Sequence, residues 1–347
     1  MMLQPLKTAL IVGFKLLLCL SVSLSCAEVY AQMPSSQAIL EQLAVNQQDL
    51  KRLDQGDIVL FNVESSGEME LTSGVVIYLP TTPAQVSGLF KKDSLASIDP
   101  LVISAGFIPL QANQEAFKRF SVKAGSDEEA EFLEATPGSQ FNLSTQEFDL
   151  IRTQESNQPD RASKLYRQIL WQRWQSYRKN GIKGIAPYDR GNNTLVNPGV
   201  DLQTAGLEHD LLKPYFPELF NAWLNYPDMP LPKGVEDFYN WSNRLVQSRA
   251  TAILTHRLML SEAQGELILI RQFYAGHSFN ANQLTIICLP YKQGSLVFYT
   301  NRTFTDQVSG FGSALKHLIG DNMAQSQVTN LLKIMQKHFK KINGNGG

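Results

Sequence analysis

The stretch that decides the fold is residues 267–306, LILIRQFYAGHSFNANQLTIICLPYKQGSLVFYTNRTFTD. It is dense in Ile, Leu, Phe and Tyr, and β-branched and aromatic residues favour strands. The Tyr-Lys-Gln-Gly segment inside it has the composition of a tight turn, because glycine tolerates the backbone angles that such turns need. We predict two or three strands, with a hairpin that places Leu289 opposite Leu296 and Gln283 opposite Arg302.

Polar side chains interrupt these apolar strands. In the predicted register, His277, Gln283, Arg302 and Asp306 share one face of the hairpin. A first interpretation is a buried polar network, in which Asp306 pairs with Arg302 and His277 bonds to a backbone carbonyl, because buried charges are normally paired. A second is a ligand-binding site in an otherwise apolar cavity, to which Arg271 also contributes.

Catalysis is a third interpretation of the same residues. His277 would act as a general base, with Asp306 or Arg302 beside it. The sequence holds no GxSxG, CxxC or HExxH motif that would supply a nucleophile or a metal site, and no glycine-rich phosphate loop. We therefore assign no catalytic residue, no metal ligand and no cofactor.

A second candidate site lies in residues 185–191, Ile-Ala-Pro-Tyr-Asp-Arg-Gly. Proline and glycine give this segment the character of a structured turn. Tyr188 and Arg190 could project from the turn into a cleft and bind a ligand. The alternative is a turn in which Asp189 and Arg190 are simply solvated.

The composition is that of a folded globular protein. The chain has 347 residues, of which 43% are hydrophobic and 18% charged. Its net charge of −1 lacks the basic excess that binding to nucleic acid requires, so we expect no nucleic-acid partner.

The N-terminus predicts the location of the protein. Residues 1–31 combine a short basic start, an apolar run and small residues before a cleavage site after Ala31, which is the pattern of a secretory signal peptide. An uncleaved anchor is the alternative, but Lys15 interrupts the run, and no later stretch is apolar enough to cross a membrane. We expect a periplasmic or secreted protein in which Cys288 is the one remaining cysteine, buried in a strand.

Periodicity and capping patterns predict the remaining elements. Thr82 before Pro83 caps a helix, and Ser144 with Glu147 forms a capping box. The predicted helices span residues 39–53, 84–92, 144–151, 160–180, 217–226, 235–245 and 310–339, and the predicted strands include residues 56–65, 71–80, 101–110, 117–122, 130–135, 250–260 and 266–271. Residues 181–234 are rich in Gly, Pro and aromatic residues and are expected to be largely irregular.

The order of these elements resembles a known fold. A strand with the local sequence VIYLPTTPAQVSGLF runs into a short helix, antiparallel strands follow, and a long helix closes the chain. This is similar to the helix-grip fold of START-type lipid-transfer and polyketide-cyclase-like proteins. The resemblance implies an α+β fold, in which a curved antiparallel sheet grips the C-terminal helix over an apolar cavity.

The resemblance also sets the expected domains. Residues 32–55 form an N-terminal linker and helix, residues 56–340 a single domain, and residues 341–347 a disordered tail. Residues 154–248 depart from the family pattern as a helical, aromatic-rich insertion.

Three functions are compatible with these features. The first is a binding or carrier protein for a hydrophobic, lipid-like small molecule. The second is an enzyme of the cyclase or hydrolase kind that uses His277 with Asp306 or Arg302. The third is a non-catalytic scaffold that contacts an envelope protein through residues 181–234.

Overall fold

A computed structural model describes residues 33–91, 94–154, 160–207, 211–308 and 313–344 of the chain. The predicted signal peptide lies outside the described residues. The predicted disordered tail lies partly within them, and there the last helix continues to Gly344.

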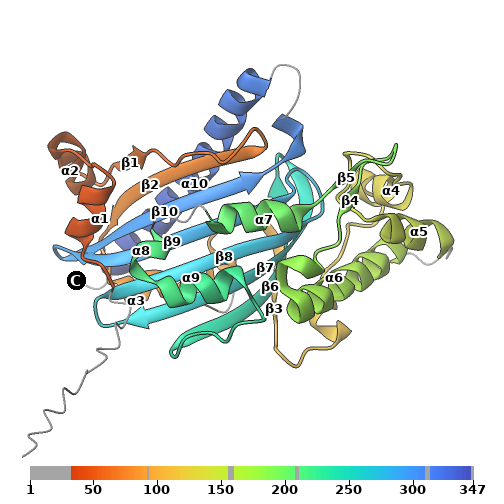
Figure 1. Cartoon of the computed structure of the whole chain (residues 1–347), viewed down its shortest axis with the longest axis horizontal. Helices are drawn as coiled ribbons and strands as arrows, with labels where there is room; N and C mark the ends of the chain where they lie inside the picture. Colours follow the sequence, from red (N-terminus) through yellow and green to blue (C-terminus); the bar gives the residue numbers. More distant parts are fainter. Residues whose placement is uncertain (1–32, 92–93, 155–159, 208–210, 309–312, 345–347) are drawn as a thin grey trace, which may run out of the picture. The chain divides into compact units, whose positions relative to one another are not determined.

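An eight-stranded antiparallel sheet forms the centre of the molecule, in the order β1-β2-β10-β9-β8-β7-β6-β3 (Figure 1). Its strands are β1 (Ile58–Phe61), β2 (Glu70–Leu79), β3 (Val102–Ile108), β6 (Val235–Val246), β7 (Arg249–Glu262), β8 (Gly265–Ala275), β9 (Ala281–Tyr291) and β10 (Gly294–Phe304). A separate two-stranded ribbon joins β4 (Tyr188–Asp189) to β5 (Leu195–Val196). The predicted α+β class with a large antiparallel sheet is confirmed.

The predicted hairpin register is also confirmed. Leu289 lies opposite Leu296, and Gln283 lies opposite Arg302. Because successive side chains of a strand point to opposite faces, this register assigns every residue of β9 and β10 to one face or the other.

Helices cover both faces of the sheet. They are α1 (Ser36–Gln42), α2 (Gln47–Asp54), α3 (Pro83–Gly88), α4 (Asp127–Leu133), α5 (Thr145–Thr153), α6 (Arg161–Asn180), α7 (Pro198–Leu207), α8 (Leu212–Tyr215), α9 (Pro217–Leu224) and α10 (Ser313–Gly344). Short 3-10 helices occur at Ser94–Ser97, Gln114–Phe117, Gly181–Gly184 and Asp306–Val308. In Figure 1, α10 lies behind the sheet, and α6, α7, α8 and α9 lie in front of it.

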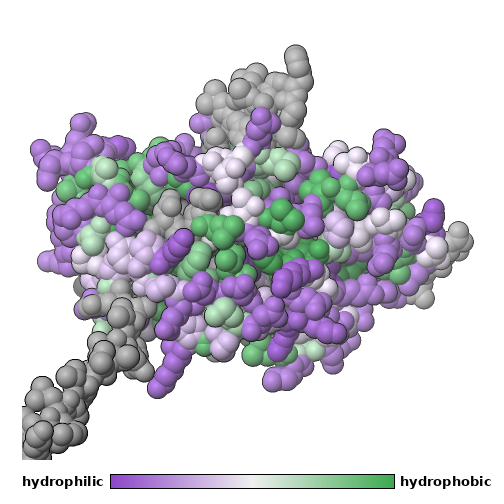
Figure 2. Space-filling model, viewed as in Figure 1, coloured by the Kyte–Doolittle hydropathy of each residue, from purple (hydrophilic) through white to green (hydrophobic). Residues whose placement is uncertain are grey.

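Three large apolar clusters, one behind the sheet and two in front of it, follow from this arrangement. Behind the sheet, α3 and α10 bury one apolar cluster against β2 and β7–β10. In front of it, α1, α2, α8 and α9 bury a second cluster, and α4, α5 and α6 a third. Figure 2 shows the front face as hydrophobic patches set among hydrophilic residues. Val200 and Leu207 of α7 are exposed apolar side chains.

The helix caps that the sequence predicts are present. Thr82 and Gln85 form a capping box at α3, and Ser144 and Glu147 form one at α5. The long predicted helix 160–180 is α6, and it ends at Gly181, whose φ of 58° favours glycine.

Several predicted elements are wrong. Residues 235–245 were expected to be a helix but form strand β6 in the main sheet, so the predicted helical insertion 154–248 contributes a strand to the central layer. Residues 130–135, expected to be a strand, lie largely in α4, and residues 117–122 form no strand. The expected helix 39–53 is divided into α1 and α2.

Helix α4 forms for a local reason, and strand β6 forms for a tertiary one. Ser126 caps α4, and three acidic residues occupy its first turn, where the helix dipole stabilises negative charge. In β6, Tyr239 and Trp241 are buried against α6 while Phe238 and Asn240 face the other side. Asp237 and Asn243 share the face of Tyr239 and Trp241, so polar residues interrupt the alternation of β6.

Candidate functional site

A cavity of about 290 Å³ lies between the back face of the sheet and α10. Its walls come from β3 and β6–β10, from Ala96 of the 3-10 helix Ser94–Ser97, and from α10. The apolar part of the wall includes Phe90, Ile270, Leu284, Tyr299, Val328 and Leu331. This cavity is the candidate functional site.

A row of neutral polar side chains crosses the floor of the cavity. The strand register pairs Asn240 with Thr255, Thr255 with Gln272, Gln272 with Asn282, and Asn282 with Thr303. These five residues, which we call the polar row, therefore lie side by side on β6, β7, β8, β9 and β10, and all five line the cavity. Neighbouring strands are about 4.8 Å apart, so the row places hydrogen-bonding groups at that interval.

Asn282 stands out within the polar row. Its Nδ2 donates to Asn301 Oδ1 and to Thr303 Oγ1, each at 2.6 Å. Its Oδ1 is buried and has no hydrogen-bond partner among the described residues, although the side chain is only 7% exposed. A buried carbonyl oxygen without a donor costs free energy, so this atom is a place where a ligand can bind.

The charged side chains of the cavity wall have protein partners, although one of their donors, Arg257 Nε, is buried with no hydrogen-bond partner among the described residues. Arg244 Nε lies 3.0 Å from Asp99 Oδ2, and Arg257 donates to the backbone carbonyl of Phe90. These contacts join β6 and β7 to the segment between α3 and β3. They hold one side of the cavity together.

The residues predicted for ligand binding lie elsewhere. None of His277, Arg302, Asp306, Gln283, Arg271, Tyr188 and Arg190 is among the described residues that line the cavity. Gln283 and Arg302 project from the front face of the sheet, one residue out of step with Asn282 and Thr303. Their ligand-binding role stays a prediction, and their observed contacts are with other protein groups.

Arg302 forms a buried ion pair. Its guanidinium lies 2.9 Å from Glu70 Oε1, and the two side chains are 5% and 0% exposed. The pair links neighbouring strands β10 and β2. The hypothesis that Asp306 pairs with Arg302 is therefore wrong in its partner.

Asp306 instead pairs with Arg190. The guanidinium lies 2.7 Å from Asp306 Oδ2, and it also donates to Asn142 Oδ1 and Asn280 Oδ1. Tyr188 donates its hydroxyl to the carbonyl of Asn280 at 2.9 Å. The segment 185–191 thus anchors the β4–β5 ribbon to the end of the main sheet, and Arg190 is not solvated as the alternative interpretation held.

Arg271 is fully buried and is held by neutral groups. It donates to Gln283 Oε1, to the Tyr177 hydroxyl and to the Trp223 carbonyl, and it stacks 4.0 Å from the Trp223 ring. The Tyr177 hydroxyl is also 2.8 Å from His256 Nδ1.

His256 connects this cluster to a carboxylate. His256 Nε2 lies 3.0 Å from Asp237 Oδ1, so the ring donates there and accepts from Tyr177 at Nδ1. Burial lowers the pKa of His256, which keeps the ring neutral. A chain of hydrogen bonds through the neutral side chains of Tyr177 and His256 therefore links Arg271 to Asp237.

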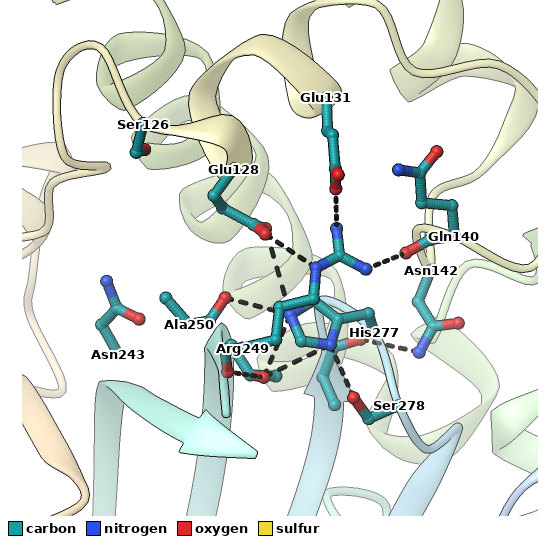
Figure 3. A network of polar contacts seen from close by, with 12 residues as sticks. Ser126, Glu128, Glu131, Gln140, Asn142, Asn243, Arg249, Ala250, His277 and Ser278 are labelled. Carbon is teal, nitrogen blue, oxygen red and sulfur yellow. Dashed lines mark hydrogen bonds and ion pairs between the residues drawn. The ribbon is translucent and has the colours of Figure 1, made fainter. Parts of the chain in front are cut away.

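His277 lies in a separate network at the end of β8 (Figure 3). Its Nε2 is 3.0 Å from the Ala250 carbonyl, which can only accept, so Nε2 carries the proton. Nδ1 then accepts from the Ser278 hydroxyl, 2.6 Å away. The expected bond between His277 and a backbone carbonyl is confirmed.

Charged neighbours set the protonation state of this network. Arg249 pairs with Glu128 at 2.7 Å and with Glu131 at 3.2 Å, as Figure 3 shows. Burial and the Arg249 charge lower the pKa of His277 to about 4, and burial raises the pKa of Glu128. The imidazolium form of His277 is therefore disfavoured, which makes it a weak general base for Ser278, although Ser278 lines the cavity.

Comparison with known proteins finds no match: no family model, curated protein or solved structure matches this chain. The resemblance to helix-grip proteins stays a prediction. Within the described residues, no helix is long and apolar enough to cross a membrane, and no group of three His, Cys, Asp or Glu side chains could hold a metal ion. Cys288 is buried and free, and burial raises its pKa well above the usual range.

Sequence reasoning missed the polar row because it followed the other face of the hairpin. Asn282 is adjacent to Gln283, and Thr303 is adjacent to Arg302. The confirmed register pairs Asn282 with Thr303 just as it pairs Gln283 with Arg302. The predicted register could therefore also have identified the pairing of Asn282 with Thr303 in the polar row.

Replacement of Arg302 tests the buried ion pair. Arg302→Met leaves the Glu70 carboxylate buried without its charged partner, so we expect a loss of about 3–5 kcal/mol in the free energy of unfolding, measured by urea denaturation. Combining it with Glu70→Leu should recover part of that loss. Arg152→Met, which breaks an exposed ion pair, is the control and should cost less than about 1 kcal/mol. A double variant as unstable as the sum of both single variants would contradict the coupling.

The pH dependence of stability tests the environment of His277. Between its usual pKa of 6.5 and its folded pKa of about 4, the unfolded state binds a proton that the native state does not. Stability is therefore lost as the pH falls below 6.5. We expect His277→Gln to remove this term, so the stability of the wild type relative to the variant should fall by about 2 kcal/mol from pH 7 to pH 5.

The comparison with the variant is essential for this measurement. Burial raises the pKa of Asp201 to about 6, and a raised carboxyl pKa changes stability with pH in the opposite direction. The wild-type curve alone would mix the two effects. Parallel pH profiles for the wild type and His277→Gln would show that His277 is not held neutral.

Proposed function

We propose that this protein binds one small amphipathic molecule in the cavity between the sheet and α10. The observation that carries the proposal is the composition of the cavity wall. Apolar side chains from β8, β9 and α10, among them Ile270, Leu284 and Val328, face the same space as the polar row. Most ligand sites combine an apolar wall with a few placed polar groups in this way.

The volume of the cavity limits the size of the ligand that it can hold. About 290 Å³ lies just below the range for small-molecule sites, roughly 300–1,000 Å³. That volume suits a compact molecule or a short apolar chain with a head group. We therefore propose an amphipathic ligand, where the sequence suggested a hydrophobic one.

Binding is favoured over catalysis by the chemistry beside the cavity. Ser278 lines the cavity, and its hydroxyl bonds to His277. The pKa of His277 is about 4. A base with so low a pKa is inefficient at removing the proton of a hydroxyl near pH 7. We propose no reaction, and the scaffold hypothesis for residues 181–234 gains no specific support.

The N-terminal sequence supports a location outside the cytoplasm. We propose that residues 1–31 direct export and are removed after Ala31, so that the mature protein is periplasmic or secreted. N-terminal sequencing of protein recovered from its native cells should find Gln32 as the first residue. A chain that retains the apolar segment would contradict cleavage and favour an anchor.

Filling the cavity tests the proposed function. Ala105 of β3 lines the cavity and is only half-buried, so Ala105→Trp should occupy ligand space without disrupting the core. We expect native mass spectrometry of the exported protein to show a bound molecule of constant mass, and this variant to lose it. Ile103→Trp, two residues along the same strand at an exposed position outside the cavity wall, is the matched control and should retain it. Equal retention by both variants would contradict the proposal.

A further inference from the structure

We infer that the ligand carries an uncharged, hydroxyl-rich head group, such as the sugar of a glycoside, and that the polar row binds this head group. The inference rests on the proposed function, because it names the ligand class of the same cavity. Four features of the cavity support it.

The first feature is the absence of charge from the polar row. Its members are two asparagines, one glutamine and two threonines, which offer only amide and hydroxyl groups. The charged residues in the described wall are Asp99, Arg244 and Arg257. Arg244 is paired with Asp99, and Arg257 donates to a backbone carbonyl, so these groups already have protein partners.

The second feature is the open acceptor on Asn282. Its buried Oδ1 needs a donor, which a hydroxyl or an N–H group supplies. A carboxylate or a fully ionised phosphate has no proton to donate and would place two acceptors against each other. The position thus selects against an anionic head group at the centre of the row.

The third feature is the arrangement of neighbouring amides. Gln272 lies directly opposite Asn282 on the adjacent strand and is half-buried. A hydroxyl can donate to Asn282 Oδ1 and accept from the Gln272 amide, because it both donates and accepts. A head group with several hydroxyls can repeat this contact along the row, where strands follow each other at about 4.8 Å. Single alcohols would satisfy only one such position.

The fourth feature is an apolar wall next to the row. Ile270 and Leu284 lie two residues from Gln272 and Asn282 on the same strands and on the same face. Two residues along a strand span about 7 Å, so an apolar group attached to the head would extend beneath α10. There it would meet Val328 and Leu331. The cavity is therefore built for a polyol joined to a short apolar group.

Isothermal titration of the mature protein with matched probes tests the inference. The probes are n-hexyl β-D-glucoside, hexanoate, hexyl phosphate and hexanol, which share one chain and differ in the head group. We expect the glucoside to bind at least about tenfold more tightly than either anion and than hexanol, because it alone supplies several donors. Methyl β-D-glucoside, which lacks the chain, separates a free sugar from an amphiphile as the preferred form.

Variants then locate the head group. Gln272→Ala and Asn282→Ala should each weaken glucoside binding by about tenfold and leave hexanol binding unchanged. Gln272 is half-buried, so its variant tests the inference even where Asn282→Ala fails to fold. Gln203→Ala, an exposed position on α7, is the control and should not change either affinity.

The outcomes separate this inference from the proposed function. Anions that bind more tightly than the glucoside, and lose binding in Ala105→Trp, would overturn the neutral head group and leave the cavity function standing. Glucoside affinity that is the same in the wild type, Gln272→Ala and Asn282→Ala would place the head group elsewhere and overturn the inference. Failure of every probe to bind folded protein, together with a ligand-free protein from native cells, would overturn both.

Discussion

The register between β9 and β10 is the constraint on which the rest of the structure depends. It places Asn282 opposite Thr303 on the back of the sheet and Gln283 opposite Arg302 on the front. A slip of one residue would exchange the two sets, because side chains alternate between faces. The Arg302 guanidinium would then face α10, and the amide of Asn282 would face the front core. A single pairing choice therefore keeps Gln283 and Arg302 out of the cavity.

The polar groups on the two faces of the sheet differ in their partners. The free-energy cost of burying each kind of group explains the difference. On the front, Arg302 pairs with Glu70 and Arg190 pairs with Asp306, so both guanidinium charges are neutralised. On the back, Asn282 Oδ1 is an acceptor with no donor among the described residues. An unpaired buried charge costs far more than an unpaired amide oxygen. A fold can leave an amide oxygen open for a ligand, but it must give a buried charge hydrogen-bond or ion-pair partners of its own.

Local sequence patterns predicted the elements whose determinants are local. The cap at Thr82, the capping box at Ser144 and the glycine at the end of α6 depend on residues within one turn, and all three are present. Strand β6 was missed because Phe238, Trp241 and Leu245 are spaced as in a helix. Asp237 and Asn243 lie on the face of Tyr239 and Trp241 and bond to distant groups, which interrupts the period of two. The segment therefore forms a strand, although the spacing of these three side chains is that of a helix.

The sequence by itself determined the register of the β9–β10 hairpin, the caps of α3 and α5 and the glycine at the end of α6, because each depends on one turn or on residues close in the chain. Only the tertiary structure decided the partners of the charges and the site of the cavity. Arg302 meets Glu70 across 232 positions of the chain, and Arg190 meets Asp306 across 116. The polar row likewise draws one residue from each of five strands. Such contacts depend on the order of strands in the sheet, which the spacing of residues within any one strand does not record.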